Sequence, residues 1–420
     1  MTVAADVLTT GPAPEAGSTR GRRIPVWAWL LIAFVLIALA RVITGRHELN
    51  SSGTLREAIM AAMPIALAAL AGLWSERAGV VNIGLEGMMI LGTIGAGYFG
   101  YWYGPWAGVV AAVIFGALGG ALHAVATVNF GVDHIVSGVA INIMAVGVAA
   151  FLAETWFTGL QGGGAVQSPP LDPPTSLQLP AVADWARGVE DQHWFLVSDA
   201  ASVVGALTRN LSLLTVIAVV LIVATYFILW RTPFGLRLRS CGESPTAAET
   251  LGVNVYRYKF IAVIISGALA GLAGGFIVLA WAGLYQNGIT GGRGYIGLAA
   301  MIFGNWRPSG LVLGAALFGY TDALQLRAGG GAVHALLIII AVVLLAYGIY
   351  LLRKGAKKAG IVTVVAAVLF AVWFFTTDVV PGDFTRMTPY VATLFVLAFA
   401  AQRLRMPAAD GVRYRRGQAG

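Results

Sequence analysis

The sequence predicts an all-α polytopic membrane protein with about 10–12 transmembrane helices, and composition gives the first support for this class. Apolar residues make up 58% of the 420 positions and charged residues only 11%, whereas a soluble domain carries about 25% charged residues. The mean hydropathy is +0.80. Glycine occupies 54 positions, and small residues let membrane helices approach one another closely.

The distribution of charge gives the second support. The formal net charge is +8, and the basic residues cluster at the ends of apolar runs. Inside-positive anchoring in a lipid membrane accounts for this pattern better than nucleic-acid binding does. The single cysteine, Cys241, permits no internal disulfide and argues against a cysteine-built metal site. We therefore predict no metal, no cofactor and no nucleic-acid partner.

The chain begins with a segment, residues 1–24, that is rich in Ala, Thr, Gly and Pro, and we expect a disordered cytoplasmic N-terminus there. Basic residues, Arg20, Arg22 and Arg23, precede the apolar run 25–42. That run is longer than the apolar part of a signal peptide and lacks a clear small-residue cleavage site. It is therefore predicted to be a retained span.

Further spans are predicted up to the middle of the chain, at residues 54–74, 83–103, 105–128, 134–157 and 211–230. If the N-terminal arginines are inside, this count returns the chain to the inside at Arg231. Segment 158–210 then lies outside. It is acidic and rich in proline, which disfavours a spanning helix. We expect an ordered outer cap, with a flexible loop as the alternative.

The loop 231–259 carries several arginines between apolar spans, which is typical of the cytoplasmic side. Inside it, Ser244 is a candidate cap, Pro245 suits a first helical position, and Gly252 is a stop signal. A helix of about two turns is therefore expected at the inner membrane face. Either it is a docking helix for a soluble partner, or the segment is an ordinary loop.

Six more spans complete the predicted transmembrane domain of residues 25–404, at 260–281, 295–303, 310–326, 333–352, 360–377 and 390–402. The basic cluster RKGAKK, residues 353–358, and the basic tail, residues 405–420, both fall on the inside in this count. About twelve crossings then place both termini in the cytoplasm, with every strong basic cluster on one side.

An internal repeat is also predicted. Residues 83–88, IGLEGM, resemble residues 296–301, IGLAAM, and each is followed by a Gly- and Ala-rich apolar run that begins at Pro105 or near Arg307. The two copies run in opposite directions in the predicted topology. An inverted repeat of this kind usually holds a substrate site near the midplane, formed by short or broken helices.

Several polar residues fall inside or beside the predicted spans. Glu86 lies among glycines in an apolar run, where a carboxylate must face a cavity, find a partner or be neutral. It and Asn82 either line a substrate pathway or lock helices together, with Arg77 as a possible partner. Asn142 lies mid-span, and Asn287 and Arg293 lie in a Gly-rich outer loop at an expected pathway entrance.

The sequence offers no enzyme machinery. GRGYIG, residues 292–297, matches a dinucleotide-binding pattern, but it follows no predicted strand, and we reject that interpretation. There is no phosphate-cradling G-x-x-x-x-G-K-[ST] motif and no nucleophile–base–acid constellation. We therefore assign no enzyme activity, and any ATP hydrolysis must come from a separate partner subunit.

Three ordered motifs resemble one transporter family. The cytoplasmic loop contains TPFG-L-R, then GE-P-AA, then G-NV; residues 75–89 read SERAGVVNIGLEGMM; and residues 293–310 read RGYIGLAAMIFGNWRPSG. Together they cover roughly residues 54–326. They resemble the permeases of ATP-binding-cassette importers for branched-chain amino acids, ribose and nucleosides, and especially the nucleoside (simple sugar) branch.

This resemblance implies a permease subunit that moves a nucleoside, or a simple sugar, across the cytoplasmic membrane by alternating access. It implies ATPase subunits, a second homologous permease chain and an extracytoplasmic substrate-binding lipoprotein as partners. ATPase coupling would involve residues of the 231–259 loop, namely Gly242, Glu243, Pro245, Ala248, Glu249 and Gly252. Segment 333–383 adds a helical pair to the family pattern. The alternative is an ion-coupled secondary transporter of a small polar solute.

Overall fold

The computed structural model describes residues 26–387 and 404–417. The disordered segment predicted for 1–24 and the last span predicted for 390–402 lie outside the described residues. Within the described parts the chain is helical, apart from two strands of two residues each, β1 (Ser176–Leu177) and β2 (Leu211–Ser212). Seven helical segments there are long and apolar enough to cross a membrane, which confirms an all-α polytopic membrane protein.

The first half of the described chain consists of five helices with short connections. Ser51 caps α2 by accepting from the Thr54 amide, and Asp133 caps α5. Gly104, with φ of 87°, makes the reversal before Pro105, which starts α4, as expected for a left-handed turn followed by proline. The elements are α1 (Val26–Thr44), a 3-10 turn (His47–Leu49), α2 (Ser52–Arg77), α3 (Leu85–Tyr103), α4 (Pro105–Ala124), a π-helical turn (Val125–Asn129) and α5 (His134–Phe157).

The segment predicted as an outer cap, residues 158–210, is ordered and contains two short helices and β1. It is fastened to the start of the chain by a buried ion pair, in which Arg41 Nε lies 2.9 Å from Asp199 Oδ1. The middle elements are α6 (Pro180–Glu190), α7 (Val197–Thr208), α8 (Leu213–Arg231), α9 (Pro233–Glu243) and α10 (Pro245–Thr250).

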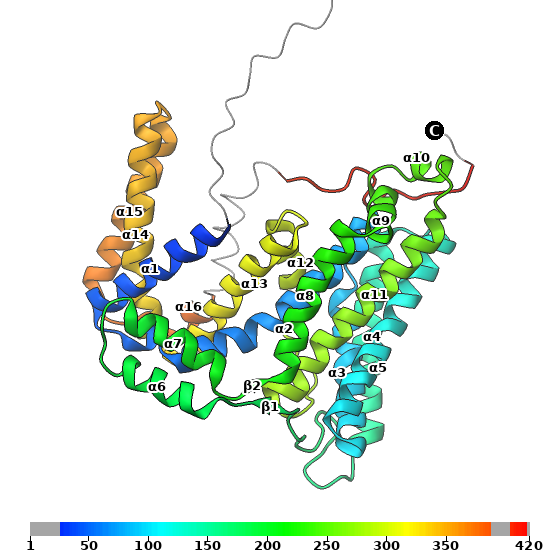
Figure 1. Ribbon diagram of the computed structural model, residues 1–420, viewed down its shortest axis with the longest axis horizontal. Helices are drawn as coiled ribbons and strands as arrows, with labels where there is room; N and C mark the ends of the chain where they lie inside the picture. The colour runs from blue at the N-terminus through cyan, green and yellow to red at the C-terminus, as the bar shows by residue number, and fades with distance from the viewer. Residues whose placement is uncertain (1–25, 388–403, 418–420) are drawn as a thin grey trace, which may run out of the picture.

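The second half repeats the order of the first. The remaining elements are α11 (Val255–Phe276), a π-helical turn (Ile277–Ala282), α12 (Arg293–Phe303), α13 (Pro308–Ala323), a π-helical turn (Leu324–Ala328), α14 (Gly329–Arg353), α15 (Lys357–Thr376) and α16 (Gly382–Arg386). Helices α2–α3–α4 correspond in order to α11–α12–α13, and α4 and α13 both start with proline and end in a π-helical turn. Figure 1 shows α2 and α11 running in opposite directions.

The two copies differ in register from the sequence match. That match aligns Gly84 with Gly297, but Gly84 directly precedes α3 whereas Gly297 lies in the second turn of α12. The residue that directly precedes α12 is Gly292. Helix α12 is also much shorter than α3, so it covers only part of the membrane thickness, whereas a span was predicted for 295–303.

Glycines hold the two copies together. A Cβ on Gly267 would lie 2.4 Å from the carbonyl oxygen of Gly116, and one on Gly271 would lie 2.2 Å from that of Ala112. Helices α4 and α11 therefore meet backbone to backbone. The matching contact of α2 with α13 is equally close, because a Cβ on Gly319 would lie 2.5 Å from the Ala58 carbonyl oxygen. Close packing of this kind stabilises helix association in lipid, where the hydrophobic effect does not drive helices together.

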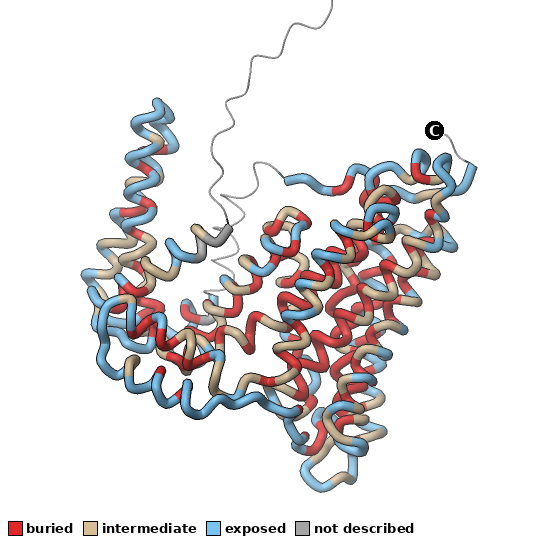
Figure 2. The backbone as a smooth tube through the Cα atoms, viewed as in Figure 1, coloured by how far each residue is buried: buried red, intermediate tan, exposed pale blue. Residues whose placement is uncertain are grey.

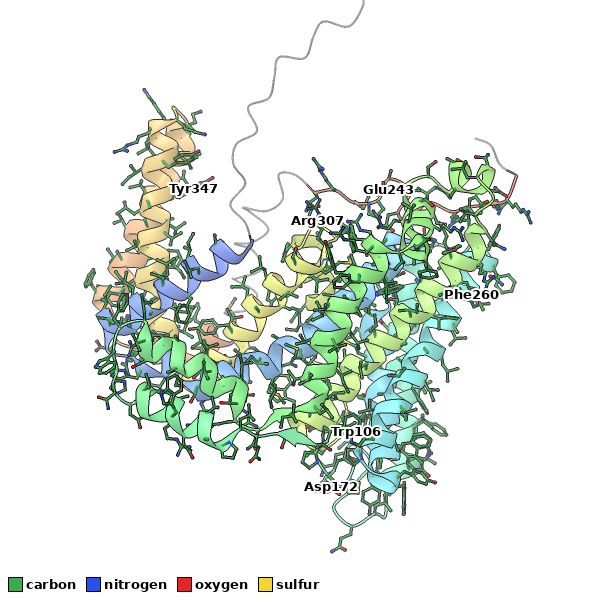
Figure 3. The ribbon with its side chains drawn as sticks, in the orientation of Figure 1. Trp106, Asp172, Glu243, Phe260, Arg307 and Tyr347 are labelled. Carbon is green, nitrogen blue, oxygen red and sulfur yellow. The ribbon has the colours of Figure 1, made fainter. Side chains whose placement is uncertain are left out.

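The bundle has two distinct ends. Figure 3 shows Glu243 and Arg307 at one end and Trp106 and Asp172 at the opposite one. The turn between α14 and α15 points the same way as the Glu243 end (Figure 1). Buried residues concentrate in α2, α3 and α11, whereas the pair α14–α15 is largely exposed (Figure 2). That exposure is expected of helices that face lipid.

Candidate functional site

Two connections turn back into the bundle. Helix α2 ends near Arg77, and residues 78–84 lead back to the start of α3; α11 ends in its π-helical turn, and residues 283–292 lead back to the start of α12. Four glycines of the second connection, Gly283, Gly288, Gly291 and Gly292, have positive φ. Irregular backbone at membrane depth must have its polar groups satisfied by protein.

The Glu86 carboxylate satisfies polar groups of the irregular backbone at the start of α12. Its Oε1 accepts from the Thr290 hydroxyl at 2.6 Å and from the Gly292 amide at 3.0 Å, and its Oε2 accepts from the Gly294 amide at 2.7 Å. The side chain is buried. It therefore caps the N-terminus of α12, where a negative charge is favoured. A Cβ on Gly294 would lie 2.6 Å from Glu86 Cα, so the approach requires glycine.

Asn142 and Asn82 extend this junction. The Asn142 carbonyl oxygen accepts from the Gly87 amide at 2.7 Å, and its amide group donates to the Tyr295 hydroxyl at 2.9 Å. Asn82 is fully buried; it accepts from the Gly84 amide at 3.0 Å and donates to Ser266 Oγ at 3.0 Å. We call Asn82, Glu86 and Asn142 the polar junction. Its polar groups are engaged with neighbouring helices. Arg77, which the sequence offered as a partner of Glu86, instead donates to the Trp306 carbonyl oxygen.

Arg293 belongs to a second, more exposed group. Its guanidinium lies 2.7 Å from Asp322 Oδ2 and 4.6 Å from the centre of the Trp281 ring. The Trp281 indole donates to Glu57 Oε1 at 2.7 Å. Arg293 and Asp322 are 18% and 19% exposed, and Arg293 Nε has no hydrogen-bond partner among the described residues. We call Glu57, Trp281, Arg293 and Asp322 the charged cluster; it can offer a ring face and charged groups to a polar solute.

Asn287 lies apart from both groups. It is exposed, and its side-chain oxygen accepts from the Tyr285 hydroxyl at 2.6 Å. Its backbone amide donates to the Val166 carbonyl oxygen, which ties the 283–292 connection to the outer segment. Among residues 26–387 and 404–417, no three His, Cys, Asp or Glu side chains lie close enough to hold a metal ion.

The short helix predicted in the 231–259 loop is present as α10. Pro245 starts it and Gly252, with φ of 81°, follows its end. The Ser244 side chain makes no capping bond, contrary to the expectation from sequence. A groove of about 380 Å³ beside α10 is lined by Phe234, Arg237, Leu251, Gly252, Val253, Asn254, Arg257, Tyr258 and Ile261.

The predicted coupling residues take different positions around α10. Gly242 lets α9 pack on the end of α2, since a Cβ there would lie 2.4 Å from the Arg77 carbonyl oxygen. Ala248 is buried beside Cys241. Burial of the Cys241 thiol raises its pKa to about 11. Glu243 is exposed and lies 3.8 Å from Arg77. Glu249 accepts from the Tyr414 hydroxyl and, at 3.2 Å, from Arg416 Nε.

Sequence reasoning did not single out Glu57, Asp322, Ser266 or Thr290 as site residues. Glu57 and Asp322 lie inside predicted spans, and a charged residue in a span is a signal of function that would have found both. No such signal exists for Ser266, because hydroxyl residues are common in membrane helices, or for Thr290, which lies in the irregular connection before α12.

The internally repeated bundle, with a short helix that starts inside it, defines the class of this protein. It is a multi-pass membrane transport protein. The chain belongs to the family described as branched-chain amino acid transport system / permease component, whose model matches residues 54–348. The recognition of this family from the three motifs is thereby confirmed.

Curated relatives agree with this membership. The chain is 33% identical over 359 residues to the nucleoside ABC transporter permease protein NupC of Lactococcus lactis, covering 84% of this chain and 93% of that one. It is 34% identical over 274 residues to the guanosine ABC transporter permease protein NupQ of Bacillus subtilis, covering 63% and 79%. It is 34% identical over 282 residues to the putative glucose ABC transporter permease protein TsgC13 of Haloferax volcanii, covering 66% and 78%. No solved structure matches.

Proposed function

We propose that this chain is the transmembrane permease subunit of an ATP-driven importer and that it carries a nucleoside across the cytoplasmic membrane. The observation that carries the substrate is the likeness to NupC, which extends over nearly the whole of both chains. A simple sugar is the second candidate, and the likeness to TsgC13 favours it. The permease itself is not expected to hydrolyse ATP.

The two polar groups take different roles in this proposal. The polar junction holds the returning connections and α12 in place, because its atoms are bonded inside the bundle. Arg293, with Trp281 and Asp322, lines the substrate pathway, since these side chains retain exposure and include a ring face and a cation. A neutral polar ring can stack there and exchange hydrogen bonds. Asn287 lies at the outer entrance.

The cytoplasmic side is assigned to the end that carries α10 and Glu243. The basic turn at 353–358 lies at the same end (Figure 1), and Asp172, in the acidic segment 158–210, lies at the opposite end (Figure 3). This charge asymmetry supports cytoplasmic α10 and an external 158–210 segment. Helix α10 then meets an ATPase subunit, and the outer segment meets a substrate-binding lipoprotein; a second homologous permease chain completes the pathway.

The substrate assignment is tested by uptake. Cells that lack this chain should lose uptake of radiolabelled purine or pyrimidine nucleosides and keep uptake of leucine. Arg293→Ala should lower nucleoside uptake while the amount of chain in the membrane stays the same. Loss of sugar uptake with unchanged nucleoside uptake would move the assignment to the second candidate, and the permease assignment would stand.

The energy source is tested by purification. In mild detergent a P-loop ATPase subunit should co-purify with the chain, and nucleoside uptake should stop when cellular ATP is depleted at constant membrane potential. An ion-coupled carrier, the rival class, would retain no ATPase and would respond to the potential instead.

A further inference from the structure

Residues 404–417, which we call the strap, cross the same end of the bundle as α9 and α10 (Figure 1, red). The strap contains no helix or strand. Its Arg405 amide donates to Asn305 Oδ1 at 2.6 Å, in the connection between α12 and α13, and its Ala409 amide donates to the Gly242 carbonyl oxygen of α9 at 2.8 Å. It therefore joins the second copy of the repeat to the docking region.

In the far half of the strap, one side chain, that of half-buried Tyr414, packs inward, and the residues on either side of it are exposed. Tyr414 packs against the buried cluster of Cys241, Ala248 and Val255, and its ring centre lies 5.3 Å from that of Tyr256. Its hydroxyl donates to Glu249 of α10. The strap thus supplies a side chain to the small core that fixes α10 on α9 and α11.

Asp410 is buried in the middle of the strap. It is only 9% exposed, and neither carboxylate oxygen has a hydrogen-bond partner of normal geometry in the described chain. The Asp410 carboxyl interacts electrostatically with Glu76 and Arg77 of α2 and with Lys259 of α11. Because α2 belongs to the first copy of the repeat and α11 to the second, Asp410 lies where both copies meet the docking region.

The strap leaves the outward face of α10 open. Thr246, Ala247 and Thr250 remain exposed, and Leu251 is 84% exposed. A partner can therefore contact α10 without displacing the strap. This arrangement argues against a strap that blocks docking, and it leaves Glu249 engaged within the chain rather than free for a partner.

We propose that the strap is a positioning element that connects α10 to both copies of the repeat, so that displacement of α10 by the ATPase subunit is transmitted to the bundle. The proposal rests on the proposed function, because it assumes that α10 is the contact for that subunit. Tyr414 and Arg416 act through Glu249, and Asp410 acts through the ends of α2 and α11.

The test uses the full chain co-expressed with its ATPase subunit in proteoliposomes. Three quantities are measured: ATPase subunit retained per permease, ATP hydrolysed, and radiolabelled purine or pyrimidine nucleoside transported per ATP. Tyr414→Ala should keep the subunit and continue hydrolysis, while nucleoside transported per ATP falls about fivefold, the lower end of ordinary coupling between two sites. Tyr414→Phe, which keeps the ring, should fall less.

A matched pair of surface variants guards against misfolding. Arg416→Gln removes the guanidinium that contacts Glu249, whereas the neighbouring Arg415 is exposed and makes no hydrogen bond or ion pair within the described parts of the chain. Arg416→Gln should lower transport per ATP, and Arg415→Gln should leave it unchanged. A deletion of residues 404–420 should behave as Tyr414→Ala or more severely.

Three results would overturn the proposal. Raised uptake and hydrolysis in Tyr414→Ala would make the strap an inhibitory cover. Loss of the ATPase subunit in Tyr414→Ala would make the strap part of the docking surface. Equal transport per ATP in all variants would leave the strap without a role in coupling. A wild-type chain that retains no ATPase subunit is a separate outcome: it removes the proposed function, and the strap proposal with it.

Discussion

Glu86 and Glu249 are both held by a distant part of the chain, but their surroundings differ. Glu86 is buried, and it accepts from two backbone amides and one hydroxyl at the start of α12. Glu249 is 27% exposed and accepts from the ends of two long side chains. Backbone donors cannot rotate away, whereas side-chain donors exchange readily with water or a partner. We infer that the first contact is permanent and that the second can respond to docking.

The largest expected effect is at Glu86. Glu86→Ala leaves two amides and one hydroxyl without their acceptor inside the bundle, which should lower the free energy of unfolding by about 3 kcal/mol or more. The measurement is thermal unfolding in detergent, followed through labelling of Cys241, which is buried in the folded chain. Burial keeps the Cys241 thiol protonated by raising its pKa to about 11, so labelling reports unfolding.

A second variant tests the close approach of Gly294 to Glu86. Gly294→Ala places a Cβ 2.6 Å from Glu86 Cα, whereas Gly147→Ala, on the exposed face of α5, meets nothing within 4 Å. Gly294→Ala should destabilise the chain by about 1–3 kcal/mol. If Gly147→Ala were equally destabilising, the loss could not be attributed to the polar junction.

The charged cluster should come next. Arg293→Ala removes the partner of the half-buried Asp322 and the cation above Trp281, so we expect about a tenfold loss of nucleoside uptake, which is about 1.4 kcal/mol. Uptake by Arg293→Ala, Asp322→Ala and the double variant forms a cycle that isolates the pair. Additive losses would show that the two side chains act separately.

The strap should respond to pH. Burial raises the pKa of the Asp410 carboxyl to about 7, with Glu76, then Lys259 and Arg77, opposing the shift. The docked strap therefore binds this proton more tightly than the free strap does, so docking is strongest below the ordinary pKa of about 4 and weakens as pH rises to about 7. Tryptic release of the strap should increase over that window, and Asp410→Asn should remove the dependence.

The smallest effect is expected at Glu249. Glu249→Gln keeps an acceptor for Tyr414 and loses the ion pair with the 83%-exposed Arg416, so the stability of the chain should fall by less than about 1 kcal/mol. Unfolding measured through Cys241 labelling checks this. A loss as large as that of Glu86→Ala would abolish the distinction between the two carboxylates.

Local signals located the docking helix well. Proline at its start and glycine after its end predicted a helix within 245–251, and α10 spans Pro245–Thr250. These signals depend on backbone geometry within a few residues. The ordered segment 158–210 was also anticipated, but its fastening through Arg41 and Asp199 depends on a pairing across 158 residues.

The sequence alone could not identify the contact partners of the candidate residues. The sequence left open whether Glu86 faces a pathway, locks helices or pairs with Arg77, because a costly buried carboxylate satisfies all three descriptions. Only the approach of α12, some 208 residues away, shows which groups the Glu86 carboxylate contacts. Likewise, Glu249 was expected to take part in ATPase coupling, and the cation that it contacts, Arg416, comes from the chain's own tail.

The repeat was found from sequence, but its register was not. Gly- and Ala-rich segments match one another at several offsets because their side chains carry little information. The starts of α3 and α12 instead follow the returning connections at Gly84 and Gly292. Those connections differ in length, and this difference separates the sequence match from the structural one.

The close contacts of α4 with α11 and of α2 with α13 restrict how the chain can move. Each contact joins a helix of one copy to a helix of the other, with backbone atoms rather than rotatable side chains at the interface. The two copies therefore move as one rigid body, because neither contact contains a hinge. We therefore expect a transport cycle to change distances between two permease chains. Spin labels on α4 and α13 of one chain should keep a constant separation when ATP is added, and a changed separation would place the hinge inside the chain.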